Sequence, residues 1–232
     1  NPDLVVVGNV AASTNPEWVY VQENNIPHVS YPELIKKFFL KENSIVCSGT
    51  YGKTSSAALL SQILTDANYN PSYMFGGLSI DETPSAIIGS GVWNVLEGDE
   101  YKTARWDNSP KFAHYDPTHL LLTAVEWDHA DIYPTEQKYF ETFETLVQSL
   151  PANGLLVVSE RAHEYAEFAS CNTVSYGLSE HNDYMYSNLV SNKDGIEFDI
   201  THDEKTYHIH SPFISEYQAE NITGSFALAH SI

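Results

Sequence analysis

A short apolar run that leads straight into a glycine-rich loop sets the architecture that this chain can adopt. Residues 44–48 read Ser-Ile-Val-Cys-Ser, which is typical of a buried strand. The loop Gly49-Thr50-Tyr51-Gly52-Lys53-Thr54-Ser55 follows at once, and an Ala- and Leu-rich helical segment continues to about Ala67. A strand, a loop and a helix in this order favour a parallel sheet that is covered by helices.

The residue types of this loop suit phosphate binding. Gly49 and Gly52 let the backbone wrap closely around phosphate oxygens, and the helix N-terminus beyond them presents free N–H groups and partial positive charge. The Lys53 ammonium can reach the β- and γ-phosphates of a nucleotide, and the Thr54 hydroxyl can ligate magnesium. The general phosphate-loop pattern has glycine where this chain has Cys47, so the alternative is a glycine-rich turn that only caps a helix.

Strand-like and helix-like segments alternate through the chain up to Gly177. Further strands are predicted at residues 72–75, 92–97, 119–124, 155–158 and 173–176, and helices over 135–150 and 160–170. After Gly177, short alternating segments separated by turns predict an antiparallel meander, and a last helix begins near Glu216. The predicted fold class is therefore α/β, as in phosphate-loop NTPases: a mostly parallel sheet with helices on both faces, plus a small antiparallel β meander.

The first 43 residues form a separate pattern. Strands are predicted at residues 4–7 and 27–29, and helices over 16–24, with Asn15 as the cap, and over 31–40. We interpret residues 1–43 as the C-terminal part of a Rossmann-like domain and residues 44–232 as the central nucleotide-binding domain. The chain starts with Asn and opens in an apolar run, so we expect further sequence before residue 1 and after Ile232.

Charge and composition argue against several classes of protein. The formal net charge is −20 with only 11 Lys and Arg residues, which argues against a nucleic-acid partner. Cys47 and Cys171 lie far apart, so neither a zinc site nor a disulfide framework is expected, and a reducing cytoplasm fits. No apolar run has the length of a membrane helix, so we expect no membrane insertion.

Two acidic segments follow predicted strands, at the edge where parallel sheets bind ligands. The first reads Glu97-Gly98-Asp99-Glu100-Tyr101, and the second reads Glu126-Trp127-Asp128-His129-Ala130-Asp131. A hard cation that bridges phosphates prefers carboxylate and hydroxyl oxygens, which makes Glu97 a candidate. Solvated surface charge is the alternative for the acids, and an ordinary surface or core residue is the alternative for His129.

A phosphate loop without its first glycine, together with these acidic segments, resembles the Mur ligase family, whose loop reads GTxGKT followed by Ser or Thr. Further similar segments, in the family's order, are Pro2-Asp3-Leu4-Val5-Val6-Val7-Gly8-Asn9, Asn15-Pro16, Asp107 with Lys111-Phe112, and His114-Tyr115. The resemblance extends along nearly the whole chain. Among the family members, the chain is most similar to those that join UDP-N-acetylmuramate to the tripeptide L-alanyl-γ-D-glutamyl-meso-diaminopimelate during recycling of cell-wall precursors.

The resemblance implies an ATP-dependent, ADP-forming ligase of peptidoglycan synthesis, with ATP and magnesium as cofactors. It implies that residues 1–43 are the end of a UDP-sugar-binding domain and that residues 44–232 are the central ATP-binding domain. By the same resemblance, Thr54 and Glu97 ligate one magnesium ion, His129 serves a second, and Lys53, Glu97 and His129 are the catalytic set. Asp99 and Glu100 match the family's motif too and are expected to support the metal ligands or to fix the loop, and Asp128 and Asp131 are expected to orient His129 or to hold its loop. The nucleotide-binding residues implied are Gly49, Thr50, Tyr51, Gly52, Lys53, Thr54, Ser55 and Asn221.

The chain departs from the family pattern at three places. The family usually has His at Tyr51, Asn at Ala124, and a Gly-x-His-Asn-x-x-Asn segment near the last helix. Of that segment only Asn221 is present here, and Tyr217 stands at the position of its His. Two alternatives therefore stay open: the ligase that adds L-alanine to UDP-N-acetylmuramate, and a nucleotide-binding module without ligase activity. Tyr101 and Lys111-Phe112 favour the tripeptide ligase over the alanine ligase.

Overall fold

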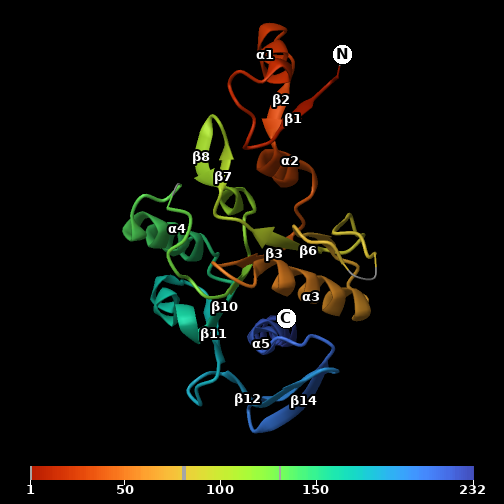
Figure 1. Ribbon diagram of the computed structural model, residues 1–232, viewed down its shortest axis with the longest axis vertical. Helices are drawn as coiled ribbons and strands as arrows, with labels where there is room; N and C mark the ends of the chain where they lie inside the picture. Colours follow the sequence, from red (N-terminus) through yellow and green to blue (C-terminus); the bar gives the residue numbers. More distant parts are fainter. Residues whose placement is uncertain (1, 80–81, 131) are drawn as a thin grey trace.

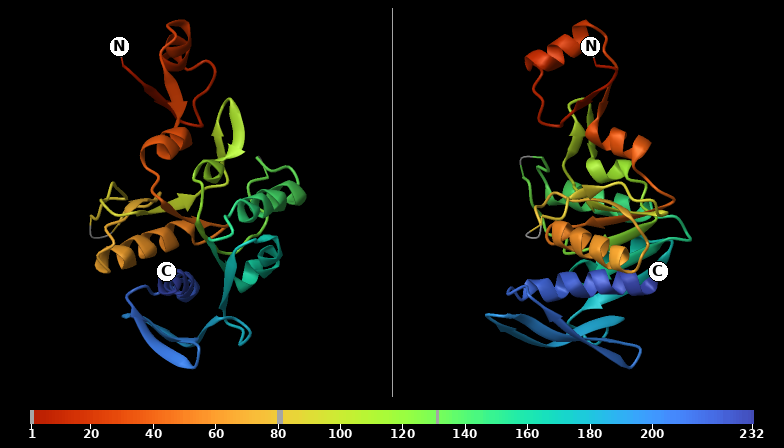
Figure 2. Two further views of the ribbon diagram at one scale, coloured as in Figure 1. Left: turned by 180° about the vertical axis from the view of Figure 1, so that it is seen from behind. Right: turned by 90° about the vertical axis from the view of Figure 1, so that its right-hand side faces the viewer.

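The computed structural model describes residues 2–79, 82–130 and 132–232, and its parts follow one another along one long axis (Figures 1 and 2). The N-terminal unit lies at one end, a large sheet with its covering helices occupies the middle, and an antiparallel meander lies at the other end. The N-terminal unit has a core cluster of its own, whereas the meander shares a core cluster with the middle of the sheet.

The N-terminal unit is a small β-α-β arrangement. Strand β1 (Val5–Val7) pairs in parallel with β2 (His28–Ser30), and helix α1 (Pro16–Glu23) lies between them in sequence. The Asn15 side chain accepts hydrogen bonds from the N–H groups of Glu17 and Trp18, which confirms the predicted cap. Its core is a separate cluster of buried side chains, namely Val7, Trp18, Val21 and Ile26.

Helix α2 (Tyr31–Phe38) connects this unit to the large sheet. Ser30 and Glu33 form a capping box at its start, with each side chain bonded to the backbone N–H of the other residue. Its apolar face packs against the large sheet and not against the N-terminal cluster. Ile35 and the adjoining Phe39 belong to a core cluster of the large sheet.

The large sheet has ten strands in the order β14-β13-β12-β11-β10-β9-β3-β6-β4-β5. Its parallel part consists of β3 (Asn43–Ser48), β4 (Ser72–Met74), β6 (Trp93–Gly98), β9 (His119–Leu122), β10 (Leu155–Ser159) and β11 (Asn172–Gly177), and β5 (Ala86–Ile87) joins the edge in antiparallel. Strand β3 lies between β6 and β9. The strands that follow it in the chain are therefore placed on both sides of it, with β4, β5 and β6 on one side and β9 to β14 on the other. Such a switch point is where open α/β sheets bind ligands, beyond the carboxyl ends of the strands.

Helices cover both faces of this sheet (Figure 2), which confirms the predicted fold class. Helices α3 (Lys53–Asp66) and α5 (Tyr217–Ser231) bury Leu60, Leu64 and Leu228 on one face. Helix α4 (Glu136–Gln148) and the 3₁₀ segment η2 (Glu160–Phe168) bury Phe143 and Tyr165 on the other. The strands of a parallel sheet that is covered on both faces have continuous apolar sequences, because neither face of the sheet contacts water.

The meander continues the same sheet. Strands β12 (Tyr184–Asn192), β13 (Gly195–His202) and β14 (Lys205–Ser211) pair in antiparallel, as predicted, and β12 joins β11 in parallel at Tyr176 and Tyr184. Helix α5 lies against it, with Ala227 and Leu228 in the core cluster that also holds Phe198 and Ile200.

The structure differs from the sequence predictions in three places, of which one is the unpredicted two-residue strand β5 at the edge of the sheet. The helical segment predicted over 160–170 is present, but as a 3₁₀ helix broken at Ala162, whose φ is −137°, and not as a continuous helix. Sequence patterns also missed the hairpin of β7 (Lys102–Ala104) and β8 (Asp107–Pro110) and the turn η1 (Lys111–His114) that follows it. These strands are three and four residues long and have no run of alternating apolar residues, which explains why periodicity did not reveal them.

Candidate functional site

A pocket of about 380 Å³ lies beyond the carboxyl ends of the central strands. The phosphate loop and the first turn of α3 form one side, with Thr50, Gly52, Lys53, Thr54 and Ser55. The end of β6 contributes Glu97, Asp99 and Tyr101, and the segment after β9 contributes His129. The pocket therefore gathers side chains from three neighbouring strand ends, at the switch point of the sheet.

Two glycines give the phosphate loop its shape. Gly49 has φ +132°, and a Cβ there would lie 2.1 Å from Oγ1 of Thr123. Gly52 has φ +80°, and a Cβ there would lie 2.2 Å from Oδ1 of Asn221. Both positions require the left-handed backbone region and a close approach to a neighbouring segment, which only glycine allows.

The segment after β9 holds the loop in place. The backbone N–H of Thr50 donates to the carbonyl of Ala124 at 2.7 Å, and Oγ1 of Thr123 donates to the carbonyl of Tyr51 at 2.5 Å. Oγ1 of Thr50 donates to the carbonyl of Glu126 and accepts from its N–H. Gly52 stands at the cap position of α3 without a side chain, so it offers no side-chain cap to the first-turn N–H groups. A partial positive charge results at the helix end that borders the pocket.

Thr54 and Glu97 form a pair of neighbouring oxygen donors. Oγ1 of Thr54 lies 2.6 Å from Oε1 of Glu97, and the second oxygen of Glu97 accepts from the backbone N–H of Gly76 at 2.6 Å. Adjacent ligands of an octahedral magnesium ion are about 3 Å apart, as follows from metal–oxygen distances near 2.1 Å. The Thr54 hydroxyl donates to the Glu97 carboxylate across this contact, and the two oxygens would have to separate by about 0.4 Å to ligate one magnesium ion. A hydroxyl and a carboxylate side by side are donors that suit a magnesium ion which also binds phosphate oxygens.

Lys53 and His129 meet at a buried carboxylate. Nζ of Lys53 lies 3.2 Å from Oε2 of Glu100, and Nε2 of His129 lies 3.0 Å from Oε1. The other ring nitrogen of His129 is 3.1 Å from the hydroxyl of Tyr101. A second tyrosine, Tyr133, contacts the backbone of Glu100. Burial raises the pKa of the Tyr133 hydroxyl to about 12, so it stays protonated and donates to the carbonyl of Glu100 at 2.5 Å.

The charge of the pocket has a chemical consequence. Lys53 is the cation on its wall, while Glu97 and Asp99 are acids that face the same space, and Asp99 pairs with Lys111 at 2.9 Å. A polyphosphate would bring further negative charge into this space. Divalent cations would offset that charge, so the donor set suits a nucleotide that enters together with magnesium.

The structure thus brings together most of the residues predicted for the site. Thr50, Gly52, Lys53, Thr54, Ser55, Glu97 and His129 all line the pocket. Gly49, Tyr51 and Asn221 do not: Gly49 and Asn221 shape the loop from behind, and the Tyr51 side chain is 53% exposed. Among the described residues, no group of three or more His, Cys, Asp or Glu side chains is arranged to hold a metal ion by itself.

The supporting acids and the missed residues complete the site. Asp128 accepts from the backbone N–H of His129 at 2.7 Å, and His129 has the unusual φ of +56°. Asp131, also predicted to support His129, lies outside the described residues. The sequence patterns give no role to Thr123. They give Glu100 a supporting role only, and the structure places its carboxylate against Lys53 and His129. The signal for Glu100 was its position three residues after Glu97, on the same strand-end segment.

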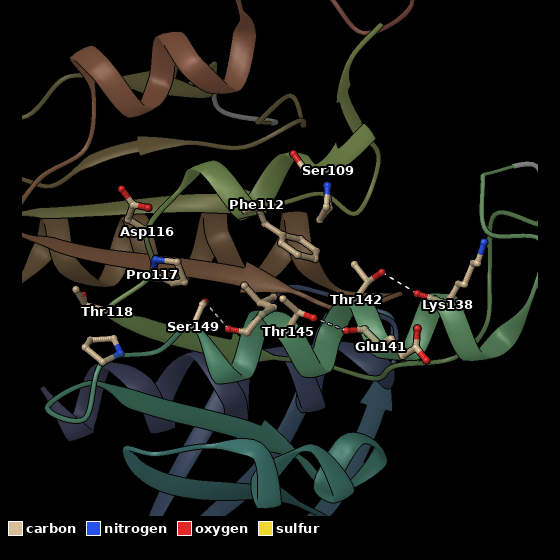
Figure 3. A pocket seen from close by; sticks show the side chains of 14 residues that line it. Ser109, Phe112, Asp116, Pro117, Thr118, Lys138, Glu141, Thr142, Thr145 and Ser149 are labelled. Atoms are coloured by element: carbon tan, nitrogen blue, oxygen red, sulfur yellow. Dashed lines mark hydrogen bonds between the residues drawn. The ribbon is translucent and has the colours of Figure 1, made fainter. Parts of the chain in front are cut away.

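A larger cavity of about 750 Å³ lies away from this chemistry, between η1 and α4 (Figure 3). Its wall includes Phe112, Pro117 and Leu146. The hydroxyls of Thr142 and Thr145 on that wall donate to carbonyls of their own helix. The smaller pocket is the better candidate because its polar groups converge on one space.

Neither cysteine is placed for chemistry. Cys47 lies in β3 with no exposed surface, and burial raises the pKa of its thiol well above the ordinary range. Cys171 is a second free thiol, on a different element. As for membranes, the helices in the described part of the chain include none with the length and apolar content needed for a crossing.

Comparisons with known proteins agree with this geometry. Residues 47–229 match the family model described as the Mur ligase middle domain. The chain is 29% identical to a UDP-N-acetylmuramate–L-alanyl-γ-D-glutamyl-meso-2,6-diaminoheptandioate ligase of Haemophilus influenzae over 99% of its length. It is 28% identical to a UDP-N-acetylmuramate–L-alanine ligase of Dictyoglomus turgidum over 86%. It spans 51% and 42% of the lengths of these two relatives.

A solved structure is similar along almost the whole chain. The UDP-N-acetylmuramate:L-alanyl-γ-D-glutamyl-meso-diaminopimelate ligase from Neisseria meningitides superposes with a TM-score of 0.84 and 26% identity, covering 98% of this chain and 74% of the other. The similarity includes the N-terminal unit and the meander as well as the sheet.

Proposed function

Because this chain belongs to the Mur ligase family, we propose that the protein is an ATP-dependent, ADP-forming ligase that joins UDP-N-acetylmuramate to L-alanyl-γ-D-glutamyl-meso-diaminopimelate. The observation that carries the proposal is the convergence of Lys53, Thr54, Glu97 and His129 around one pocket at the switch point of the sheet. We further propose that residues 1–43 end a UDP-sugar-binding domain, that residues 44–232 are the ATP-binding domain, and that the protein works in the cytoplasm.

The nucleotide is proposed to bind with its phosphates on the loop of residues 49–55, against the N-terminus of α3. Lys53 is the residue proposed to contact the phosphates directly, as the cation on the wall of the pocket. Asn221 is proposed to support the nucleotide side of the loop, since its buried side chain lies directly behind Gly52. Thr54 and Glu97 would hold one magnesium ion and His129 a second; when bound, magnesium supplies positive charge next to the transferring phosphoryl group.

The proposed reaction has two stages. The muramate carboxylate attacks the γ-phosphorus of ATP, which gives an acyl phosphate and ADP, and the amine of the tripeptide then attacks the acyl carbon and phosphate leaves. Lys53 stabilises the negative charge on the phosphoryl oxygens, and the loop orients the triphosphate for attack. His129 is held by Tyr101 and Glu100, so it keeps a defined orientation at the pocket wall.

The direct test is phosphate release by the full-length protein. With ATP and UDP-N-acetylmuramate present, we expect release only when an amine acceptor is added, and faster with the tripeptide than with L-alanine. Faster release with L-alanine would favour the alanine ligase, to which the Dictyoglomus turgidum relative corresponds. ATP binding without release in either mixture would favour a nucleotide-binding module without ligase activity, which the departures at Ala124 and Tyr217 would then explain.

Lys53→Ala provides the residue-level check of the same proposal. The loss of a group that stabilises charge in the transition state slows catalysis by about 10²–10³-fold, judged from oxyanion-hole donors. We expect phosphate release to fall at least this far while the thermal unfolding midpoint stays close to the original. A matched control is Lys36→Ala, which removes an exposed lysine paired with Asp116 and should leave the rate unchanged. Full activity of a folded Lys53→Ala protein would refute the proposed role.

A further inference from the structure

Glu100 is a buried acid that lies behind the wall of the pocket. Its side chain has no exposed surface, and it does not line the space where a ligand would sit. Both of the basic side chains that do line that space contact it, Lys53 at 3.2 Å and His129 at 3.0 Å. A buried carboxylate requires such partners because it has lost its water. Glu100 can therefore influence the pocket through Lys53 and His129 without touching a ligand.

Lys53 is turned back onto its own loop. Its Nζ lies 2.7 Å from the carbonyl oxygen of Gly49 and 3.2 Å from that of Thr50, in addition to its contact with Glu100. An ammonium group has three N–H donors, and these three partners can use all of them. A phosphate oxygen that arrives in the pocket must therefore replace at least one partner of Lys53.

Glu100 is the charged partner among the three, and it is the one that competes with phosphate most directly. The two carbonyls are part of the loop that would surround the phosphates, whereas Glu100 attracts the ammonium toward the interior. The carboxylate Oε2 of Glu100 is buried and receives no hydrogen bond of good geometry in the described part of the chain, although it lies 3.2 Å from Nζ. Nζ of Lys53 donates instead to Oε1 of Glu100, at the long distance of 3.5 Å. The contact is thus an ion pair with one long hydrogen bond, and it can be exchanged for a phosphate contact.

We propose that Glu100 is a positioning residue that holds Lys53 against its own loop and gives it up when a nucleotide phosphate binds. This inference rests on the proposed function, because it assumes that a nucleotide enters the pocket. Glu100 lowers the affinity for the nucleotide, since the ion pair must be broken on binding. It also gives Lys53 a partner to return to when the product diphosphate leaves.

The test is calorimetric titration of the full-length protein with ADP in the presence of EDTA, so that metal ligation does not contribute. Glu100→Gln keeps the shape of the side chain but removes its charge, and we expect it to bind ADP at least about fivefold more tightly than the unmodified protein. Asp116→Asn removes the same charge from the exposed pair with Lys36 and should change the affinity by less than about twofold.

A second pair of variants tests whether the effect passes through Lys53. In the Lys53→Ala background, Glu100→Gln should no longer tighten ADP binding, because there is no ammonium left to release. A gain of equal size in that background would overturn the inference and indicate a general charge effect. A purely structural role for Glu100 predicts unchanged or weaker binding by Glu100→Gln, which would also overturn it.

The outcomes separate this inference from the proposed function. If the unmodified protein does not bind ADP with or without magnesium, the proposed function fails and the inference fails with it. If the unmodified protein binds ADP but Glu100→Gln does not bind it more tightly, only the inference fails. Should Glu100→Gln not fold, Glu100→Asp, which withdraws the carboxylate by one methylene, is expected to bind ADP about twofold more tightly; equal or weaker binding would overturn the inference.

Discussion

At the scale of single residues, Gly52 sets the shape of the phosphate loop. Its φ of +80° lies in the left-handed region, and a Cβ there would lie 2.2 Å from Oδ1 of Asn221.

Gly52 offers a residue-scale prediction with a matched control. Gly52→Ala should lower the free energy of unfolding by at least about 1–2 kcal/mol, because a residue with a Cβ disfavours the left-handed region that φ +80° requires. The new methyl group would also meet Oδ1 of Asn221. Urea unfolding of the variant measures the loss, and ADP binding should weaken in parallel, since the loop would shift.

The control for this change is Gly8→Ala. A Cβ at Gly8 would have nothing within 4 Å, so we expect no measurable change in stability or in ADP binding. Adding Asn221→Ala to Gly52→Ala should recover the steric part of the loss and leave the backbone part. Equal stability of Gly52→Ala and Gly8→Ala would contradict this account of the loop.

Gly52, Lys53 and Thr54 can be predicted from their spacing alone, and they lie together on the pocket wall. The contact of Thr123 with the loop cannot, and the motif gives Glu100 a supporting role without naming its partner Lys53. These contacts join segments far apart in the chain and depend on the register of β3 with its neighbours, which local patterns do not contain.

At the scale of elements, the predictions succeeded where a helix or strand carries its own signals. Asn15 and Pro16 predicted the start of α1, and the apolar run before Gly49 predicted β3. The helical pattern over 160–170 corresponds to the 3₁₀ segment η2, in which Ala162 and Tyr165 are buried at helix-like spacing although the backbone breaks at Ala162. Composition and spacing describe which side chains are buried, but they do not distinguish a 3₁₀ segment from an α-helix.

The capping box of α2 yields an element-scale prediction that depends on pH. Hydrogen bonds from the backbone and the hydroxyl of Ser30 hold the pKa of Glu33 below its ordinary value of 4.5. Because the folded-state pKa is the lower one, this carboxylate stabilises the fold above pH 4.5 and loses its contribution as the pH falls through the folded-state pKa. Glu33→Gln should therefore lower the free energy of unfolding by about 0.3–1 kcal/mol at pH 7.

The pH dependence separates the charge of Glu33 from the intrinsic helix propensities of Glu and Gln, which do not explain a difference that disappears in acid. Thermal unfolding of Glu33→Gln and of the unmodified protein should converge as the pH falls below the folded-state pKa of Glu33. Glu17→Gln in α1 is the control, because it also removes an acid from the first turn of a helix. Helix α1 has no capping box to lose, since Trp18 stands where a capping box needs Glu or Gln. A difference at pH 7 that persists unchanged in acid would contradict the role of the charge.

At the scale of the whole molecule, one hairpin connects the proposed nucleotide pocket to the N-terminal unit. The chain passes from Glu97 and Tyr101 on the pocket wall directly into β7, and the β7–β8 hairpin extends toward β1 and β2 (Figure 1). Trp106, in its turn, stacks on Trp18 with ring centroids 5.3 Å apart and contacts His28 edge-on at 5.5 Å. Strands β7 and β8 are too short to show a periodic sequence pattern, so the sequence does not predict this contact between the hairpin and the N-terminal unit.

Trp106→Ala should loosen the N-terminal unit without unfolding the sheet. Each aromatic pair contributes about 0.5–1.5 kcal/mol, so loss of both contacts should speed amide hydrogen exchange in β1, α1 and β2 by roughly fivefold to a hundredfold. Exchange in β3 and β9 should not change, because their buried apolar side chains pack between the helices of both faces. Trp127→Ala is a fair control, since Trp127 is 44% exposed against 43% for Trp106 but bonds to Tyr133. If exchange in the N-terminal unit stays the same in Trp106→Ala, the hairpin does not hold the two cores together, and α2 alone must connect them.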